Sequence, residues 1–383
     1  MIVLILAACG SDATPTQAPR NPATLTAPTG EAWTTGDVPI TLENVQTIRY
    51  LGRLDPPDVV ATWFDFTLSP DSTALAALNV DQLASWDLLT GRPFFYTGRG
   101  NLIHVYYSPD KTELYGVTDA GVTDVYDALT GSQMNTFNAH PAFAAVTVFH
   151  ADTGWLALGG TDGTIKVWDT FERQSLVTIN AHSEAISVLA FSEDGTRLAS
   201  ASIDGTVRVW DWQSRQQIDQ FEPENADILH MTFSPDGTRL ALGTGTTALL
   251  WTFGLTPTTM DTGGSEVLLF NGDGRYLLAG SRSDGLTMWD GVQASYIGLL
   301  PDTAGDGVTA AFSPDGSLLI TATLNRGVFL WNLNEITGEQ LNQATLEIGT
   351  RQIYRVHWTD DGRLILFFDA VGAIYLWGIA QGS

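Results

Sequence analysis

A turn sequence that recurs eight times constrains the fold of this chain more than any other feature. Each copy lies between two apolar runs and places Asp or Gly, often after Pro, where a tight turn favours them. Each copy is therefore expected to join two antiparallel strands. The eight copies are SPDS at Ser69, SPDK at Ser108, HADTG at His150, SEDG at Ser192, SPDG at Ser234, NGDG at Asn271, SPDG at Ser313 and TDDG at Thr359.

An aromatic residue follows each turn and gives the repeat its period. Consecutive aromatic residues are 40, 42, 42, 41, 38, 42 and 46 positions apart, close to the roughly 40 to 45 residues of one β-propeller blade. The repeat runs through the chain from 42 to 383, so we predict one all-β propeller of eight blades. The eight residues are Trp86, Tyr126, Trp168, Trp210, Trp251, Trp289, Trp331 and Trp377.

One repeat unit shows how a blade is built from four short strands. Its first strand has Ile186 and Val188 on one face and Leu189 and Phe191 on the other, so both faces must be covered. Four-stranded blades stacked in a closed ring provide that cover. The predicted strands are AISVLAF at 185–191, RLASAS at 197–202, TVRVWD at 206–211 and QQIDQF at 216–221.

The last unit is one strand short, because only GIAQGS follows Trp377. The segment TIRYLGRL at 47–54 precedes the first complete unit and has the composition of a strand. We therefore expect this N-terminal strand to pair with the last blade and close the ring.

Two copies of the repeat resemble the ends of WD40 repeats: TDGTIKVWD at 161–169 and IDGTVRVWD at 203–211. The resemblance covers roughly 42–383 and implies a WD40-type β-propeller. Seven blades are the commoner number in that family, so a ring of seven is the alternative to eight.

The resemblance also implies a buried set of hydrogen-bonded side chains. In the family these are a His before the first strand, a Ser or Thr on the second, an Asp in the next turn and the Trp. His182, Ser202, Asp204 and Trp210 match this pattern.

A second unit has the same spacing, with His140, Asp162 and Trp168 in the corresponding places. Gly160 stands where Ser202 would be, so this set is expected to lack the hydroxyl. The other six units lack the turn aspartate at the matching position and are expected to rely on packing.

The N-terminal segment 1–9 ends an apolar run in Leu6, Ala7, Ala8 and Cys9, which resembles the lipobox of bacterial lipoproteins. By that resemblance Cys9 becomes the first mature residue and carries the lipid. Residues 10–41 are rich in Thr and Pro and are expected to form a disordered linker. We thus expect an extracytoplasmic lipoprotein held at the membrane by its lipid anchor alone. A secreted protein with an incidental cysteine is the alternative.

The net charge of −25, with lysine only at Lys111 and Lys166, argues against nucleic acid as a partner. Motifs for acyl transfer, structural zinc and metalloprotease chemistry do not occur in the sequence. The GTGTTA run at 243–248 has dinucleotide-like glycine spacing, but it lies between two predicted strands with no helix to follow. We therefore predict no cofactor and no catalytic residue.

Three histidines fall on predicted first strands, which line the central channel of a propeller: His104, His230 and His357. Metal ligands must converge to about 2 Å from the ion, and these residues belong to units two, five and eight. We therefore interpret them as structural histidines and predict no metal site.

The sequence thus favours a non-catalytic scaffold that binds other proteins, because a rigid ring offers two faces of variable loops and no catalytic group is visible. A small-ligand or sugar-binding propeller, or a hydrolase, with its site at the channel mouth is the first alternative. The ectodomain of a signalling system is the second.

Overall fold

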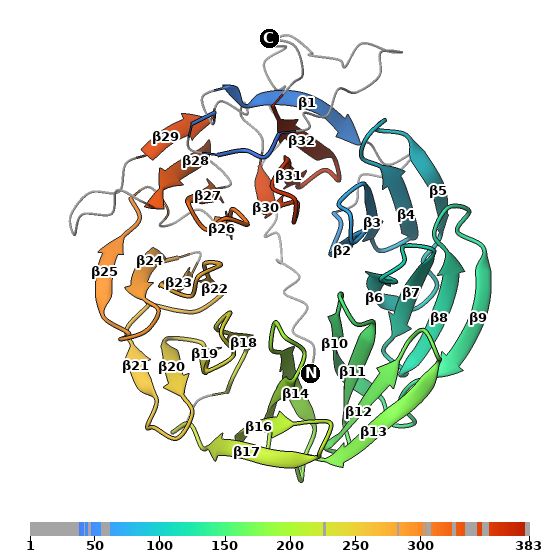
Figure 1. The fold of residues 1–383 in the computed structure, drawn as a ribbon, viewed down its shortest axis with the longest axis vertical. Helices are drawn as coiled ribbons and strands as arrows, with labels where there is room; N and C mark the ends of the chain where they lie inside the picture. Colours follow the sequence, from blue (N-terminus) through green and yellow to red (C-terminus); the bar gives the residue numbers. More distant parts are fainter. Residues whose placement is uncertain are drawn as a thin grey trace, which may run out of the picture.

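The computed structural model describes residues 38–41, 43–44, 47–54, 62–224, 227–281, 283–301, 303, 308–323, 327–333, 343–346 and 352–379. Within them the chain forms eight four-stranded antiparallel sheets around a central channel, an eight-bladed β-propeller (Figure 1). The prediction of eight four-stranded blades is confirmed, and the seven-bladed alternative is wrong. No helix in the described ranges is long and apolar enough to cross a membrane.

The first two strands of each blade flank the recurrent turn. The inner strands, which line the channel, are β2 (Asp65–Leu68), β6 (Leu102–Tyr107), β10 (Ala144–His150), β14 (Ile186–Phe191), β18 (His230–Phe233), β22 (Val267–Phe270), β26 (Val308–Phe312) and β30 (Ile353–Trp358). The second strands are β3 (Ala74–Leu78), β7 (Glu113–Thr118), β11 (Trp155–Gly160), β15 (Arg197–Ser202), β19 (Arg239–Gly243), β23 (Tyr276–Ser281), β27 (Leu318–Thr323) and β31 (Leu364–Asp369).

The third strand of each blade carries the periodic aromatic residue. These strands are β4 (Gln82–Asp87), β8 (Val122–Asp127), β12 (Thr164–Asp169), β16 (Val207–Asp211), β20 (Ala248–Thr252), β24 (Gly285–Asp290), β28 (Gly327–Asn332) and β32 (Ile374–Gly378). The outer strands are β5 (Pro93–Gly98), β9 (Gln133–Asn138), β13 (Gln174–Asn180), β17 (Gln216–Phe221), β21 (Thr258–Met260), β25 (Tyr296–Leu299), β29 (Gln343–Leu346) and β1 (Arg49–Leu54).

Neighbouring blades pack face to face and bury the apolar residues of their middle strands. Between the last and first blades, Trp63 and Trp86 meet edge to face with ring centroids 5.3 Å apart, and Leu366 is buried in the same cluster. Each large apolar side chain buried this way contributes about 1.5 to 3 kcal/mol. Stacking of neighbouring blades therefore covers both faces of the strands, as expected.

The N-terminal strand β1 closes the ring by pairing antiparallel with β32. Tyr50 lies opposite Trp377 and Leu54 opposite Ile374, so the segment expected at 47–54 supplies the outer strand of the last blade. Ile40, within the segment predicted to be a linker, is buried against the last two blades, and its N–H donates to the carbonyl of Gly362 at 2.9 Å.

The antiparallel order gives the ring two distinct faces. We call the face with the eight recurrent turns between inner and second strands the turn face. The opposite face, which we call the loop face, carries the turns between second and third strands and the connections from each outer strand to the next inner strand. The GTGTTA run at 243–248 is one such turn, because Gly243 of β19 pairs with Ala248 of β20.

Candidate functional site

The inner strands line a channel whose end near the loop face forms a cavity of about 640 Å³. The charged or titratable residues in its wall include Asp65, His230, Glu266 and Arg355, which lie near the starts of inner strands. The cavity therefore offers both signs of charge at one end of the channel. Its volume is in the range of small-ligand sites.

The three channel histidines have different surroundings. His230 and His357 line this cavity, whereas the Nδ1 atom of His104 lies 3.5 Å from the carboxylate of Asp65. Burial and the nearby Arg355 guanidinium lower the pKa of His357 to about 4, so its ring is neutral at pH 7. Among the described residues, no group of three or more His, Cys, Asp or Glu side chains is arranged to hold a metal ion.

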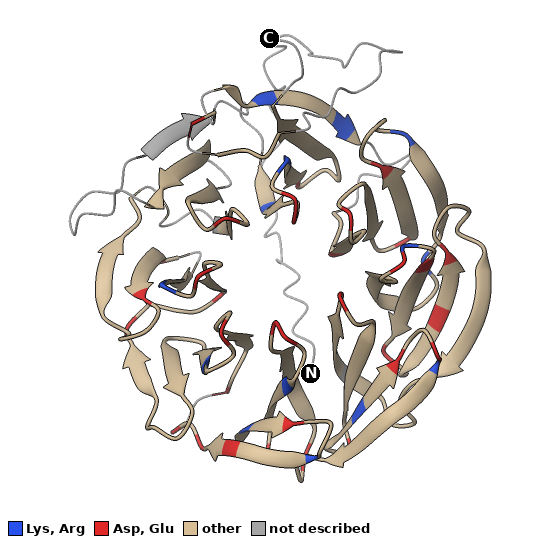
Figure 2. Ribbon diagram, in the orientation of Figure 1, with Lys and Arg blue, Asp and Glu red and all other residues tan. Residues whose placement is uncertain are grey.

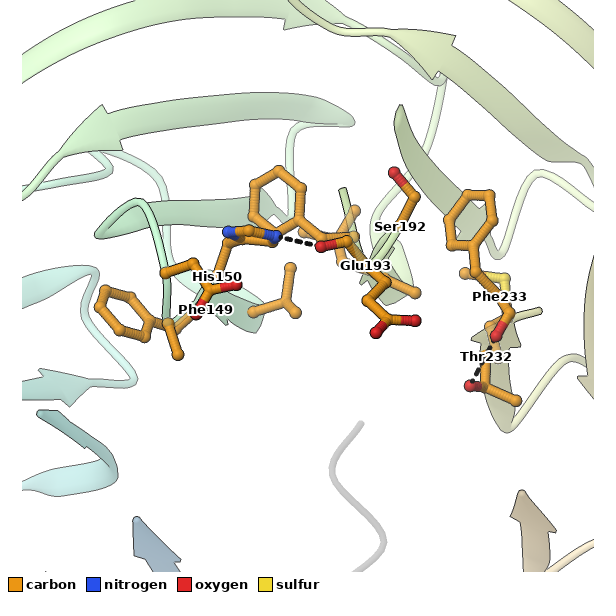
Figure 3. Close-up of a pocket in the computed structure, with 13 residues that line it drawn as sticks. Phe149, His150, Ser192, Glu193, Thr232 and Phe233 are labelled. Atoms are coloured by element: carbon orange, nitrogen blue, oxygen red, sulfur yellow. Dashed lines mark hydrogen bonds between the residues drawn. The ribbon is translucent and has the colours of Figure 1, made fainter. Parts of the chain in front are cut away.

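The channel end near the turn face holds two further cavities. One, of about 370 Å³, lies against the inner strands β10, β14 and β18 (Figure 3). In its wall His150 places Nδ1 2.9 Å from the hydroxyl of Thr153 and Nε2 2.9 Å from the backbone carbonyl of Glu193. His150 thus ties its own turn to the turn of the next blade.

The second cavity on this side is larger, about 670 Å³. Its wall includes Phe270, Phe312 and Trp358 at the ends of inner strands, together with residues of several recurrent turns. An apolar floor and a polar rim therefore meet at the channel mouth of the turn face.

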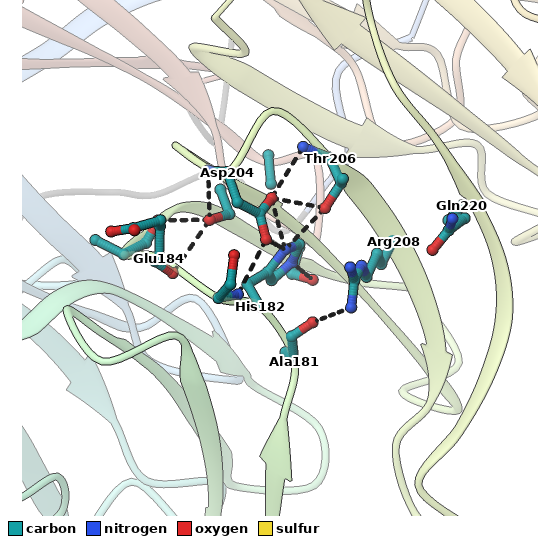
Figure 4. Close-up of polar contacts among 12 residues, drawn as sticks. Ala181, His182, Glu184, Asp204, Thr206, Arg208 and Gln220 are labelled. Atoms are coloured by element: carbon teal, nitrogen blue, oxygen red, sulfur yellow. Dashed lines mark hydrogen bonds and ion pairs between the residues drawn. The ribbon is translucent and has the colours of Figure 1, made fainter.

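The polar network predicted in the fourth blade is present, with one correction. The Nδ1 atom of the fully buried His182 lies 3.1 and 3.2 Å from the two carboxylate oxygens of Asp204 (Figure 4). The hydroxyl of the network belongs to Ser200, however, and not to Ser202. Ser200 Oγ lies 2.7 Å from His182 Nε2 and accepts a hydrogen bond from Trp210 Nε1 at 3.0 Å.

Ser202 is on the same strand but bonds elsewhere. Its hydroxyl lies 2.9 Å from the backbone carbonyl of Ala185 and accepts the backbone N–H of Asp204 at 3.1 Å. Ser200 and Ser202 share one face of the strand, because side chains alternate across a sheet. Ser202 therefore holds the loop-face turn, while Ser200 connects the histidine to the tryptophan.

Electrostatics in this network follow from its bonding. Hydrogen bonds from Thr206 and from the backbone of Ser183 outweigh the effect of burial and lower the pKa of Asp204 to about 2. Burial lowers the pKa of His182, which makes its ring neutral at pH 7. A neutral ring that donates from Nδ1 to Asp204 accepts at Nε2 from Ser200, and every member of the chain is then satisfied.

The corresponding unit in the third blade is bonded differently. His140 places Nδ1 3.0 Å from the carbonyl of Ala142 and Nε2 3.1 Å from the hydroxyl of Thr164. Trp168 donates to the carbonyl of Ala139 at 2.6 Å, and Asp162 accepts from the hydroxyl and backbone N–H of Thr164. The predicted residues lie together, but the described contacts include no hydrogen bond between His140 and Asp162.

The sequence did not reveal the hydroxyl groups that accept hydrogen bonds from the tryptophans of other blades. Trp331 Nε1 donates to the hydroxyl of Thr321, ten residues earlier, as Trp210 does to Ser200. Trp289 Nε1 donates to the hydroxyl of Thr287, two residues earlier on its own strand. A Ser or Thr ten residues before the tryptophan is the sequence signal that identifies the first kind of pair.

The loop face carries three exposed apolar residues beside the ring closure, Phe64, Val80 and Val371. Together with the neighbouring Arg99 we call them the seam patch. The exposed fractions are 39% for Phe64, 62% for Val80 and 55% for Val371. The Phe64 N–H bonds the carbonyl of Leu78, two residues before Val80, and the Arg99 guanidinium lies 5.3 Å from the centre of the Phe64 ring.

The other side of the patch is fixed by the residue before Phe64. Trp63 Nε1 donates to the carbonyl of Gly372 at 2.7 Å, which ties the residue before Phe64 to the turn that carries Val371. The Arg355 guanidinium lies 3.4 Å from the carbonyl of Phe64. Two arginines thus contact Phe64, one at its ring and one at its backbone carbonyl.

Comparisons with known proteins agree with this architecture. One family model, the Vps8 beta-propeller, matches residues 129–247, and another, the WD domain, G-beta repeat, matches residues 299–332. A search of curated proteins finds no match to the sequence. The crystal structure of the computationally designed protein Ika8 is similar in fold, with a TM-score of 0.66 and 18% identity over 84% of this chain and 97% of that chain. The eight blades and the two family models together support a WD40-type propeller.

Proposed function

We propose that this protein is a non-catalytic scaffold that binds other proteins through the seam patch. The observation behind this proposal is the exposure of Phe64, Val80 and Val371 on segments that hydrogen bonds join at the ring closure, since clustered apolar surface commonly marks an interaction site. The match to the WD repeat supports the same proposal, because WD40 propellers generally bind proteins.

The chemistry of the patch suggests what its partner presents. Arg99 and Arg355 both contact Phe64, so two positive charges lie at this part of the surface of a chain whose net charge is −25. An apolar segment with acidic residues beside it is complementary to such a patch. We infer that the partner presents a segment of this kind.

A photo-crosslinker at position 80 tests the docking site in native membranes. We expect a protein partner to be captured at Val80 and lost when Arg99→Glu is added. Leu255, 66% exposed on the turn face, is the matched position for the crosslinker, and Arg215→Glu is the matched charge change. Capture of the same proteins at both positions, or equal loss with Arg215→Glu, contradicts the proposal.

The proposal includes a lipid anchor at Cys9, which places the scaffold outside a bacterial membrane. Cys9, the segment 1–9 and the linker up to residue 37 lie outside the described residues, so the support is the lipobox resemblance alone. Mass spectrometry of native membranes should find an acylated Cys9, and Cys9→Ser should move the protein to the soluble fraction. An unmodified Cys9 in membrane-bound protein refutes the anchor.

A further inference from the structure

The recurrent turns use most of their aspartates to hold themselves together. In six of the eight turns, one Asp carboxylate accepts a hydrogen bond from the Ser or Thr that opens the turn. The pairs are Ser69 with Asp71, Ser108 with Asp110, Ser192 with Asp194, Ser234 with Asp236, Ser313 with Asp315 and Thr359 with Asp361. Figure 2 shows acidic residues at the inner tips of the blades around the channel. These six carboxylates are structural.

Three other acidic residues of the turns are different: Asp152, Glu193 and Asp360. Their carboxylates make no hydrogen bond or ion pair with any residue that the structure describes. Glu193 and Asp360 occupy the second turn position, where the other turns have Pro, Gly or Ala. All three line the 670 Å³ cavity at the turn-face mouth, and Figure 3 shows the Glu193 side chain extending from its turn into the channel.

The negative charge of this mouth is uncompensated within its own wall. No lysine or arginine is among the described residues that line the cavity. Burial raises the pKa of Asp360, and the carboxylates of Asp361 and Asp152 raise it further. A positive ligand would relieve this repulsion, because opposite charges interact strongly where water is partly excluded.

The floor of the same cavity supplies a neutral polar group and apolar walls. His357 is largely buried, its ring nitrogens bond no described residue, and its pKa of about 4 keeps it uncharged. Phe270, Phe312 and Trp358 line the same cavity. The histidine offers a hydrogen bond to a ligand N–H, and the rings suit a hydrocarbon chain.

We propose that the turn-face mouth binds a linear organic cation of the diamine or polyamine class. The carboxylates come from the third, fourth and eighth blades, so their charge is spread around the mouth rather than gathered at one point. The described residues include no cluster fit to hold a metal ion, which favours a cation with several separated positive centres. Methylene links between those centres match the apolar walls. This site is independent of the scaffold proposal, which concerns the opposite face.

Calorimetry with spermidine as the probe tests the site on the purified full-length protein. We expect saturable binding at one site per chain, weakened by added salt because charge attraction is screened. The double variant Glu193→Gln with Asp360→Asn should weaken spermidine binding at least tenfold. The control Glu172→Gln with Glu224→Gln removes the same charge from exposed positions outside the cavity and should leave the affinity unchanged.

Three outcomes overturn the proposal: no saturable binding, an equal loss in the control variant, or tight binding of Mg²⁺ or a tetralysine peptide where spermidine fails. His357→Phe provides a second measurement at the floor, and it should weaken spermidine binding while the melting temperature shows that the ring still folds. An affinity unchanged in this variant overturns the role assigned to the floor.

Discussion

The third and fourth blades carry the same motif at the same spacing and yet bond it in two different ways. His182 contacts Asp204 on one side and Ser200 on the other, and Ser200 passes the connection to Trp210. In the third blade His140 turns to a backbone carbonyl instead. Spacing fixes where these side chains lie, but it does not fix which of them bond.

The residue that separates the two blades lies 18 positions after the histidine. In the fourth blade this is Ser200, whose hydroxyl joins histidine and tryptophan, and in the third blade it is Leu158, which is fully buried in the apolar core. Leucine offers no hydrogen bond, so Trp168 donates to the carbonyl of Ala139. The side-chain network of the fourth blade therefore includes its tryptophan, whereas in the third blade Thr164 joins His140 to Asp162 and the tryptophan bonds the backbone.

Removing the turn aspartate of each blade tests this difference most strongly. Asp204→Ala should lower the free energy of unfolding by about 2 to 4 kcal/mol, because it removes the carboxylate that His182, Ser183 and Thr206 all contact. Asp162→Ala should cost only about 1 kcal/mol, because Asp162 bonds a single neighbour, Thr164. Urea unfolding of both variants measures the two values. Equal losses of unfolding free energy would mean that the two aspartates contribute equally to stability.

Adding a hydroxyl to the third blade should fail to repair it. Gly160 corresponds to Ser202, but a Cβ built there lies 2.4 Å from His140 Cε1 and 2.4 Å from Asp162 Oδ1. Gly160→Ser should therefore destabilise by about 2 to 3 kcal/mol through overpacking. Thermal melting compares it with Ser202→Gly in the fourth blade. A Gly160→Ser protein as stable as the parent would show that the His140 ring moves aside freely.

The assignment of the network hydroxyl to Ser200 has a consequence of its own. Ser200→Ala should cost about 1 to 2 kcal/mol, because it leaves the buried His182 Nε2 and Trp210 Nε1 without a partner. Its effect should be non-additive with Asp204→Ala, since both changes break one connected network. A double-mutant cycle by urea unfolding measures the coupling. In the third blade, no such coupling is expected between positions 158 and 162.

The comparison also shows what the sequence can predict. The recurrent turns, the periodic tryptophans and the strand at 47–54 are local patterns in the sequence, and the eight blades could be predicted from them. The choice between Ser200 and Ser202 could not be predicted, because both lie on one strand face and the spacing does not show which hydroxyl meets the histidine ring.

The channel mouth illustrates the same limit. Asp152, Glu193 and Asp360 belong to turns separated by about 40 to more than 160 residues, and only closure of the ring places them around one cavity. Their turns are visible in the sequence. Only the structure shows that Asp194 and Asp361, rather than the neighbouring Glu193 and Asp360, accept the hydrogen bond from the Ser or Thr that opens the turn.

The smallest expected effect is the pH dependence that the Asp204 carboxylate gives to the fourth blade. Its pKa is about 2 in the folded protein and 3.8 as the ordinary value. The stabilisation from the ionised form is therefore complete above pH 3.8 and is lost as the pH falls through 2. We expect the difference in unfolding free energy between the parent and Asp204→Asn to shrink by about 1 kcal/mol between pH 5 and pH 2, less than the full pKa shift implies because the turn borders solvent.

Urea unfolding at several pH values measures this difference, and Glu224→Gln, an exposed substitution, should show no such trend. The His182 ring acts in the same direction at higher pH. Its pKa lies below 6.5 in the folded state, so the unfolded chain takes up its proton first as the pH falls below 6.5. A ring that titrates at or above 6.5 in NMR spectra would mean that Asp204 outweighs burial, and that the fourth blade holds an ion pair rather than a neutral network.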